Sequence, residues 1–166
     1  SSPYEAKGLL LSSIFANYPT IFFESRSLHA MKEYVPKEPY FLNPTKAFVR
    51  KKGTHLSIVG FGPSVINALE VAKKLEKLKK ISCEVIDLRS LRPLDKNSIF
   101  RSVKKTKKIL VVDNGWKSYG ISAEIVSLVS EKLLSILKEK PIRLGIREIP
   151  IPSSRALAKN CYLNSE

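Results

Sequence analysis

Short apolar runs alternate with longer segments of helical period from Leu56 onward, and this alternation limits the possible folds more than any other feature of the sequence. The apolar runs are short and rich in branched aliphatic side chains, which favours strands at 56–60, 83–88, 109–112 and 142–146. The intervening segments carry apolar residues at three- and four-residue steps, which predicts helices at 64–80, from Asp95 through Val103, and at about 120–139. The pattern predicts an α/β fold of three layers, with helices on both faces of a mostly parallel sheet.

A further strand is predicted at Ala47–Arg50, just before the first of these runs. Only a few residues separate it from the strand at 56–60, which is too short a connection for a parallel crossover. We therefore expect it to pair antiparallel at an edge, which gives a mixed sheet of five strands.

The first 43 residues do not fit this unit. Residues 4–16 predict a helix with Leu9, Leu10 and Ile14 toward a core, and residues 20–24 predict a buried strand. One helix and one strand cannot form a core of their own, and the proline-containing stretch 34–44 suits an extended linker. We expect the tail of one domain, a linker, and a nearly complete second domain at 45–166.

Composition favours an ordinary globular protein of a reducing compartment. The chain shows neither an apolar run of membrane-spanning length nor a signal-peptide pattern, and Cys83 and Cys161 are too far apart for a CxxC metal or redox motif. The net charge of +14 rests on 21 lysines and only 8 arginines. Because the lysines are spread along the sequence without interleaved aromatic residues, we expect solvated faces, with nucleic-acid binding as the weaker alternative.

The turn Gly60-Phe61-Gly62-Pro63 lies between a predicted strand and a predicted helix, where a glycine-rich loop could hold a phosphate. The third glycine of the dinucleotide motif is replaced by Val65, and a proline at the first helical position would remove one amide donor. A tight turn that starts a helix is the favoured interpretation.

Arg89, Arg92 and Asp95 follow the strand at 83–88, at the sheet edge where open α/β folds most often bind ligands. The two arginines could hold a phosphate or a carboxylate. In the favoured alternative, Asp95 caps the next helix and the arginines pair with acidic residues at a domain interface.

Asp113-Asn114-Gly115-Trp116 predicts a turn between the strand at 109–112 and the long helix that Gly120 opens. Trp116 is expected to cover an apolar edge or to enter an interface, and Glu124 lies where the helix dipole favours an acidic residue. Two isolated histidines suggest no triad or metal site, and Cys83 is expected to be an inert core thiol.

Seven motifs together resemble one family. They are, in order, PYEAKGLL, PTIFFESRSL, VPKEPY, GTHLSIVGFG, EVIDLRSLRPLD, VVDNGW followed by YGISAEI, and IPIPSSRAL. They resemble the beta subunit of the thiamin-dependent decarboxylating component of 2-oxo acid dehydrogenase complexes, of the pyruvate, branched-chain and acetoin type, and more distantly transketolase. The resemblance extends over essentially the whole chain.

The resemblance implies that 1–33 is the remnant of a pyrimidine-binding domain, 34–44 a linker, and 45–166 a transketolase C-terminal-like domain that stops before its terminal helix. Thiamin diphosphate and magnesium are implied in the intact complex, held between that pyrimidine-binding domain and an alpha subunit. The catalytic residues of relatives lie upstream of PYEAKGLL. The resemblance therefore assigns no catalytic, cofactor-binding or metal-binding residue here, and the isolated chain is expected to be inactive.

The implied role of the C-terminal domain is subunit assembly and docking to the dihydrolipoyl acyltransferase core. The candidates for contacts with the alpha subunit, or with a second beta subunit in a heterotetramer, are Arg89, Arg92, Asp95, Trp116, Tyr119 and Glu124. Glu139 and Glu148 are the candidates for core docking. The expected location is the cytoplasm, or the mitochondrial matrix or a plastid in a eukaryote, without membrane contact.

Two alternatives stay open. One is a transketolase-like, sugar-handling half-subunit. The other is a stand-alone basic module that binds a partner or a nucleic acid without catalysis, which the net charge of +14 favours and the small number of arginines disfavours.

Overall fold

The structure is a computed structural model, and it describes residues 1–163. Its five helices are α1 (Pro3–Ile14), α2 (Pro63–Lys79), α3 (Lys96–Thr106), α4 (Ile121–Leu133) and α5 (Arg155–Ala158). Two 3-10 turns are η1 (Arg26–Leu28) and η2 (Leu134–Ile136). The five strands are β1 (Phe48–Lys51), β2 (Leu56–Gly60), β3 (Cys83–Asp87), β4 (Ile109–Trp116) and β5 (Ile142–Ile146).

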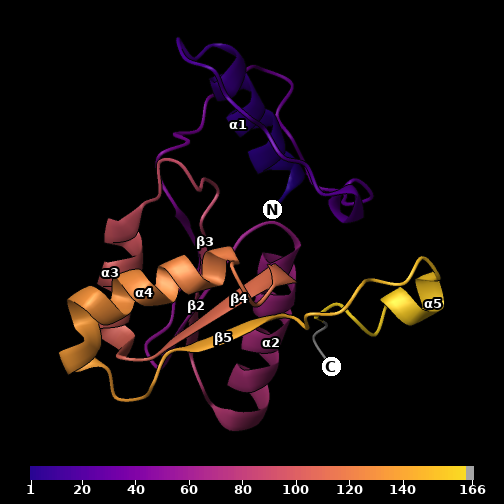
Figure 1. Cartoon of the computed structure of the whole chain (residues 1–166). Coiled ribbons are helices and arrows are strands. Elements are labelled where there is room, and N and C mark those ends of the chain that lie inside the picture. Colours follow the sequence, from indigo (N-terminus) through magenta and orange to yellow (C-terminus); the bar gives the residue numbers. More distant parts are fainter. Residues whose placement is uncertain (164–166) are drawn as a thin grey trace.

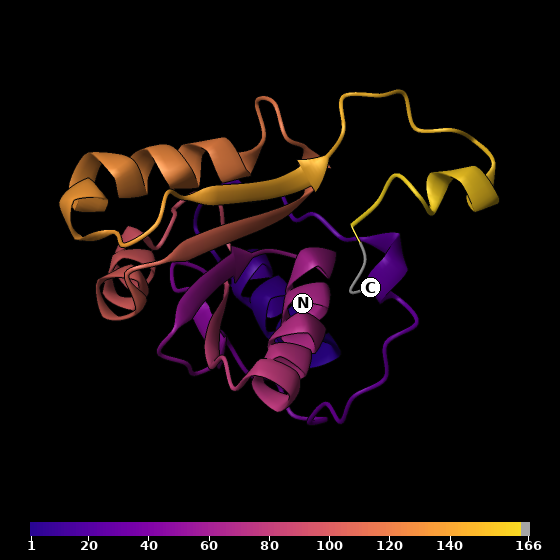
Figure 2. The same ribbon diagram turned by 90° about the horizontal axis from the view of Figure 1, so that it is seen from below.

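The strands form one mixed sheet in the order β1-β3-β2-β4-β5 (Figure 1). Strands β2 to β5 are parallel, and β1 pairs antiparallel with β3 at the edge, which confirms the predicted five-stranded arrangement. The chain moves from β2 to β3 in one direction and then crosses over β2 to β4 in the other. Right-handed crossovers therefore place α2 on one face, and α3 and α4 on the opposite face (Figure 2).

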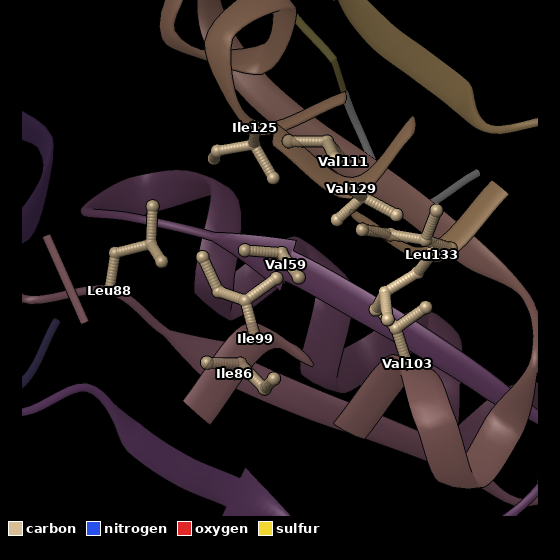
Figure 3. Packing of buried hydrophobic residues seen from close by; sticks show 10 residues of the cluster. Val59, Ile86, Leu88, Ile99, Val103, Val111, Ile125, Val129 and Leu133 are labelled. Carbon is tan, nitrogen blue, oxygen red and sulfur yellow. The ribbon is translucent and has the colours of Figure 1, made fainter. Parts of the chain in front are cut away.

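The two sheet faces carry separate apolar cores because successive strand residues point to opposite sides. On one face Val59, Ile86 and Val111 pack with the buried residues of α3 and α4, which are Ile99, Val103, Ile125, Val129 and Leu133 (Figure 3). On the other face Ile58, Val85 and Val112 pack with the residues of α2 that are buried, which are Val65, Ala68 and Ala72. The predicted three layers are confirmed.

Local sequence signals account for where the helices begin and end. Pro63 occupies the first turn of α2, and Asp95 caps α3 by accepting a 3.1 Å hydrogen bond from the Ser98 amide, as predicted. Lys80 and Lys107 end α2 and α3 in the left-handed conformation. α4 is shorter than predicted, because the chain tightens into η2 after Leu133.

β4 is longer than predicted, because Asp113–Trp116 belongs to the strand and is not a free turn. The Asp113 carboxylate accepts a 2.8 Å hydrogen bond from the Gly115 amide, which is the local bond that the Asp-Asn-Gly sequence favours. The register against β5 shifts there, and pairing resumes between Trp116 and Ile146. The turn chemistry therefore produces an irregularity inside a strand that continues through it.

The expectations for the first 43 residues are wrong in two respects. Leu10 and Ile14 of α1 are exposed, and the helix buries Glu5 and Gly8 instead. Residues 20–24 form no strand, and Ile21 and Phe23 are 81% and 86% exposed. A strand needs a neighbour for its backbone hydrogen bonds, and no described residue pairs with this segment.

The linker segment 34–44 packs along α1 and is not a free connection. The rings of Tyr4 and Tyr40 stack with centroids 4.5 Å apart, and the Tyr40 hydroxyl donates to the Tyr4 carbonyl at 2.6 Å. Ser12 donates a 2.7 Å hydrogen bond to the Leu42 carbonyl. α1 and this segment form one unit that stands beyond the end of the sheet (Figure 1).

None of the helices in residues 1–163 is both long enough and apolar enough to cross a membrane.

Candidate assembly interface

A buried carboxylate joins α1 to the sheet domain. Glu5 is 1% exposed, and its Oε1 accepts hydrogen bonds from Arg89 Nε at 2.8 Å and Arg89 Nη2 at 2.5 Å. Arg50 Nη1 of β1 lies 3.4 Å from Glu5 Oε2. A carboxylate taken out of water is costly unless it is paired, and two guanidinium groups provide the pairing here.

Phe48 of β1 completes this contact. The Arg89 guanidinium lies 4.5 Å from the centroid of the Phe48 ring, and the Arg50 guanidinium lies 5.8 Å from it. The ring thus supports both cations that hold the carboxylate. We call Glu5, Arg50, Arg89 and Phe48 the Glu5 anchor.

The pKa of Glu5 reflects these charges. Burial by itself would raise the pKa of Glu5, and the hydrogen bonds and positive charge of the Arg89 guanidinium act in the opposite direction and lower it. Arg89 has a φ of 59°, in the left-handed region, and its own amide donates to Asp87 Oδ1 at 3.1 Å. The backbone thereby turns at the end of β3 and directs the Arg89 side chain toward α1.

Arg92 and Asp95, in the loop after β3, do different things. Arg92 is exposed and forms no ion pair with any described residue. Asp95 is buried, and besides capping α3 it accepts a 3.2 Å hydrogen bond from the Ala47 amide. Burial would raise the pKa of Asp95, but the hydrogen bonds from Ser98 and Ala47 lower it below its ordinary value. Of the expected pairs with acidic residues, only that of Arg89 forms.

The loop after β4 depends on Asp113, which is buried. Besides the Gly115 amide, the Asp113 carboxylate accepts a 3.4 Å hydrogen bond from the Ser122 amide in the first turn of α4. A Cβ at Gly120 would lie 2.5 Å from the Trp116 carbonyl oxygen and 2.8 Å from Asp113 Oδ2, so only glycine fits. These contacts fix the connection between β4 and the start of α4.

The side chains of this loop that remain outside are large. Trp116 is 55% exposed, and Tyr119 is fully exposed with a φ of 54°. Glu124 is exposed on the first turn of α4. Because β3 and β4 both flank β2 and run in the same direction, their carboxyl ends lie at one sheet edge, about 10 Å apart.

The structure therefore divides the six interface candidates into two groups. Arg92, Trp116, Tyr119 and Glu124 are exposed at the carboxyl edge of the sheet and available to a partner. Arg89 and Asp95 are committed to contacts within the chain. An exposed aromatic pair with charged neighbours has the composition of a protein-binding surface. The role of these residues in subunit contacts stays a prediction.

The two docking candidates lie far apart. Glu148 follows β5 and accepts a hydrogen bond from Ser118 in the loop after β4, next to Trp116 and Tyr119. Glu139 lies in the connection before β5, at the other end of that strand, with its Oε1 3.8 Å from Lys108 Nζ. Glu148 thus adjoins the carboxyl edge and Glu139 does not. Docking by either residue stays a prediction.

The described residues offer no cluster of metal ligands, and the one glycine-rich turn is closed on itself. Residues 1–163 contain no group of three or more histidines, cysteines, aspartates or glutamates that could hold a metal ion. In the turn at Gly60–Pro63, the Phe61 amide donates to Ser64 Oγ at 3.1 Å, and Ser64 donates back to the Phe61 carbonyl at 2.8 Å. Ser64 thus closes this turn at the start of α2, as the favoured interpretation of a tight turn predicts.

Sequence reasoning missed Glu5 and Phe48, which carry the anchor. The one available signal was the spacing Ser2-Pro3-Tyr4-Glu5, which is typical of a helix start, and Ser2 Oγ does accept from the Glu5 amide at 3.4 Å. That signal predicts a solvated first-turn glutamate. A partner 84 residues away leaves no local pattern.

Comparison with known proteins places most of the chain in one family. The transketolase C-terminal domain matches residues 45–166. A solved structure described as a split gene transketolase, an inactive beta4 tetramer, is similar with a TM-score of 0.65 and 25% identity, and the match covers 75% of this chain and 40% of that one.

The curated relatives extend the similarity to nearly the whole chain. The pyruvate dehydrogenase E1 component subunit beta of Acholeplasma laidlawii is 42% identical over 156 residues, which cover 93% of this chain and 47% of the relative. That of Bacillus subtilis is 39% identical, covering 94% and 48%. The Bacillus subtilis acetoin:2,6-dichlorophenolindophenol oxidoreductase subunit beta is 36% identical, covering 95% and 46%. The chain spans about half the length of these relatives.

Proposed function

Because the chain belongs to the transketolase C-terminal domain family, we propose that it is the C-terminal half of the beta subunit of a 2-oxo acid dehydrogenase decarboxylating component. The observation that carries this proposal is the similarity to beta subunits, which are 36–42% identical to this chain over 93–95% of its length. Pyruvate dehydrogenase is the oxidoreductase that the proposal favours, since most of these relatives have that name. The bacterial relatives support a cytoplasmic location.

We propose that residues 1–33 are the end of a pyrimidine-binding domain, with 34–44 as the linker and 45–166 as the assembly domain. Exposed apolar side chains support this division: Ile21 and Phe23 have no cover among the described residues. So large an apolar surface is normally covered by protein. The Glu5 anchor would then fix the two domains of the subunit relative to each other.

The assembly role rests on the carboxyl edge of the sheet. Arg92, Trp116, Tyr119 and Glu124 would contact the alpha subunit or a second beta subunit. The tetrameric state named for the similar transketolase supports association with other subunits. Docking to the acyltransferase core would use Glu148, which adjoins this edge, in preference to Glu139, which lies close to Lys108.

We propose that thiamin diphosphate and magnesium bind to the intact complex, outside this chain. The described residues contain no cluster of three or more metal ligands, and Ser64 closes the Gly60–Pro63 turn, which supports a positioning role for this chain. The isolated chain should then be inactive.

The test is an assay of the intact beta subunit with its alpha subunit, thiamin diphosphate and magnesium. We expect pyruvate-dependent reduction of 2,6-dichlorophenolindophenol, and transfer of the acyl group to lipoamide. In a separate measurement by analytical ultracentrifugation, the Trp116→Ala and Tyr119→Ala variants of the beta subunit should associate more weakly with the other subunits. Full activity of this chain alone would contradict the proposal.

A transketolase-like half-subunit is the second candidate, which the similar split gene transketolase favours. Both candidates share the fold and the proposed cofactor, so the structure of this half gives no preference. Ketose donors in place of pyruvate separate them: turnover of a ketose with an aldose acceptor, without reduction of the dye, would identify a transketolase.

A further inference from the structure

The lysines that appear scattered in the sequence are gathered by the fold at one end of the sheet. Four connections lead into the amino ends of the parallel strands, and they comprise residues 51–55, 77–82, 104–108 and 138–141. Together they contain eleven lysines, one glutamate and no arginine. We call this end of the domain the lysine face. It lies opposite the end that carries α1 (Figure 1).

Hydrogen bonds hold these four connections side by side. The His55 amide donates to the Ser82 carbonyl at 2.9 Å, which joins the first connection to the second. The Ser57 amide of β2 donates to the Lys108 carbonyl at 3.0 Å, which joins the start of β2 to the third connection. The Lys138 amide donates to the Lys107 carbonyl at 2.9 Å, which joins the fourth connection to the third. At ordinary strand spacing the five strands span about 19 Å, so the face is one continuous surface.

Most of these lysines have no acidic partner. Lys51 Nζ lies 3.0 Å from Glu76 Oε2, Lys105 pairs with Glu84, and Lys108 Nζ lies 3.8 Å from Glu139 Oε1. Among residues 1–163 no ion pair forms for the other eight, which are Lys52, Lys77, Lys79, Lys80, Lys104, Lys107, Lys138 and Lys140. Eight like charges across about 19 Å give this face a positive potential, which favours an anionic partner.

Helix stabilisation explains only part of this arrangement. Lysines in the last turns of α2 and α3 are favoured by the helix dipole. The helix dipole does not explain Lys52, which follows strand β1, or Lys140, which precedes strand β5. At Lys80 and Lys107 the backbone is left-handed, with φ of 58° and 57°, where glycine would fit with less strain.

We propose that the lysine face binds an acidic protein segment, rich in aspartate and glutamate, of a partner protein. The three pairs already on the face are ammonium–carboxylate pairs, so carboxylate is the anion that its geometry accepts. The four connections lack the arginines and stacking aromatic residues that nucleic-acid surfaces use. An extended segment of about six residues would cross the face.

The test measures binding of a fluorescent 20-residue peptide of alternating aspartate and glutamate to the full chain by anisotropy. One variant carries Lys52→Gln, Lys79→Gln, Lys104→Gln and Lys140→Gln, one change in each connection. The matched control carries Lys32→Gln, Lys37→Gln, Lys96→Gln and Lys117→Gln, all exposed and outside the face. Both variants lose the same net charge, and circular dichroism checks that both are folded.

We expect the face variant to bind the peptide roughly tenfold more weakly and the control to stay within about twofold of the unmodified chain. The peptide should also raise the Tm of the unmodified chain and of the control, but not that of the face variant. Equal loss in both variants would overturn the proposal, because binding would then follow net charge alone. Tighter binding of a 20-base-pair duplex or of phosphatidylserine vesicles through the same four lysines would overturn it in favour of a nucleic acid or a lipid surface.

Discussion

Glu5 and Arg89 lie 84 residues apart in the sequence, and Arg89 Nε donates to Glu5 Oε1 at 2.8 Å. Glu5 belongs to α1 and Arg89 to the loop that ends β3, so this pair joins the N-terminal segment to the sheet domain. Arg50 and Phe48 complete the same anchor from β1. The Glu5 anchor is thus one of the contacts that hold the N-terminal segment on the sheet domain, another being the hydrogen bond from Ser1 Oγ to the Asp87 carboxylate of β3.

Glu5→Gln should release α1 from the sheet domain. The change leaves Arg89 and Arg50 without their anionic partner, and breaking a buried pair costs about 3–5 kcal/mol. The two apolar cores do not include Glu5, so the sheet domain should stay folded. Hydrogen exchange should therefore speed up in residues 3–14 and stay slow in β2 and β3.

The matched control for this change is Glu33→Gln. Glu33 is an exposed carboxylate that accepts a 3.2 Å hydrogen bond from the Tyr4 amide at the start of the same helix. The Glu33→Gln substitution should leave hydrogen exchange in α1 nearly unchanged. Similar exchange in both variants would mean that the anchor does not hold the helix.

Glu84 should make the stability of the sheet domain depend on acid pH. It is buried on β3, where burial raises the pKa, but Lys105, Ser102 and the Gly53 amide lower it below its ordinary value. A lowered pKa means that the stabilisation is present above the unfolded value of about 4.3 and is lost as the pH falls through the folded value. Urea unfolding at pH 7 and pH 3 should show a smaller difference for Glu84→Gln than for the unmodified chain.

Glu139→Gln is the control for the acid dependence. Its pair with Lys108 is longer, at 3.8 Å, and both side chains are largely exposed, so it should contribute little at either pH. If Glu84→Gln kept the full acid dependence, the contact with Lys105 would not be the cause.

Gly120→Ala should destabilise the loop after β4. The new Cβ would lie 2.5 Å from the Trp116 carbonyl oxygen, a backbone atom that cannot move without shifting the strand. We expect a loss of about 2–3 kcal/mol in chemical unfolding, as for overpacked sites.

Gly62→Ala separates backbone strain from this clash. A Cβ there meets nothing within 4 Å, but the φ of +54° penalises it, and the expected cost is about 1–2 kcal/mol. A larger loss at Gly62 than at Gly120 would contradict the close packing of the loop on Asp113.

The two cysteines should differ in reactivity. Cys83 is fully buried at the start of β3, and burial raises the pKa of its thiol, so the thiolate is scarce. Cys161 is only partly buried. Under native conditions a disulfide reagent should label Cys161 quickly and Cys83 only after unfolding in urea. Fast labelling of Cys83, checked with Cys161→Ser, would contradict the core position of β3.

The sheet domain could be predicted from sequence because its evidence is local. Branched aliphatic runs, Pro63 at a helix start and the Asp95 cap each report on their own neighbourhood. The prediction of a free turn at Asp113–Trp116 was wrong because these residues form the local turn hydrogen bond and also continue β4, with Trp116 paired to Ile146. The prediction of a buried strand at residues 20–24, which include Ile21, was wrong because an apolar run forms a strand only where a neighbouring strand can pair with it.

The candidate sites were less predictable because they depend on residues that meet only in the fold. The sequence identified Arg89 and Asp95 as candidate site residues, but it did not identify Glu5 as the partner of Arg89. The lysines looked spread because four connections far apart in sequence converge only through the parallel sheet. Sequence patterns thus predicted the individual helices and strands, whereas the sheet topology determined which side chains share a surface.

The most direct test of the account is peptide mass spectrometry and native mass spectrometry on the protein purified from its source. We expect peptides that continue upstream of Ser1 into the rest of a pyrimidine-binding domain, and a particle that contains an alpha subunit in equal amount. A native protein that begins near Ser1 and carries no such partner would contradict it.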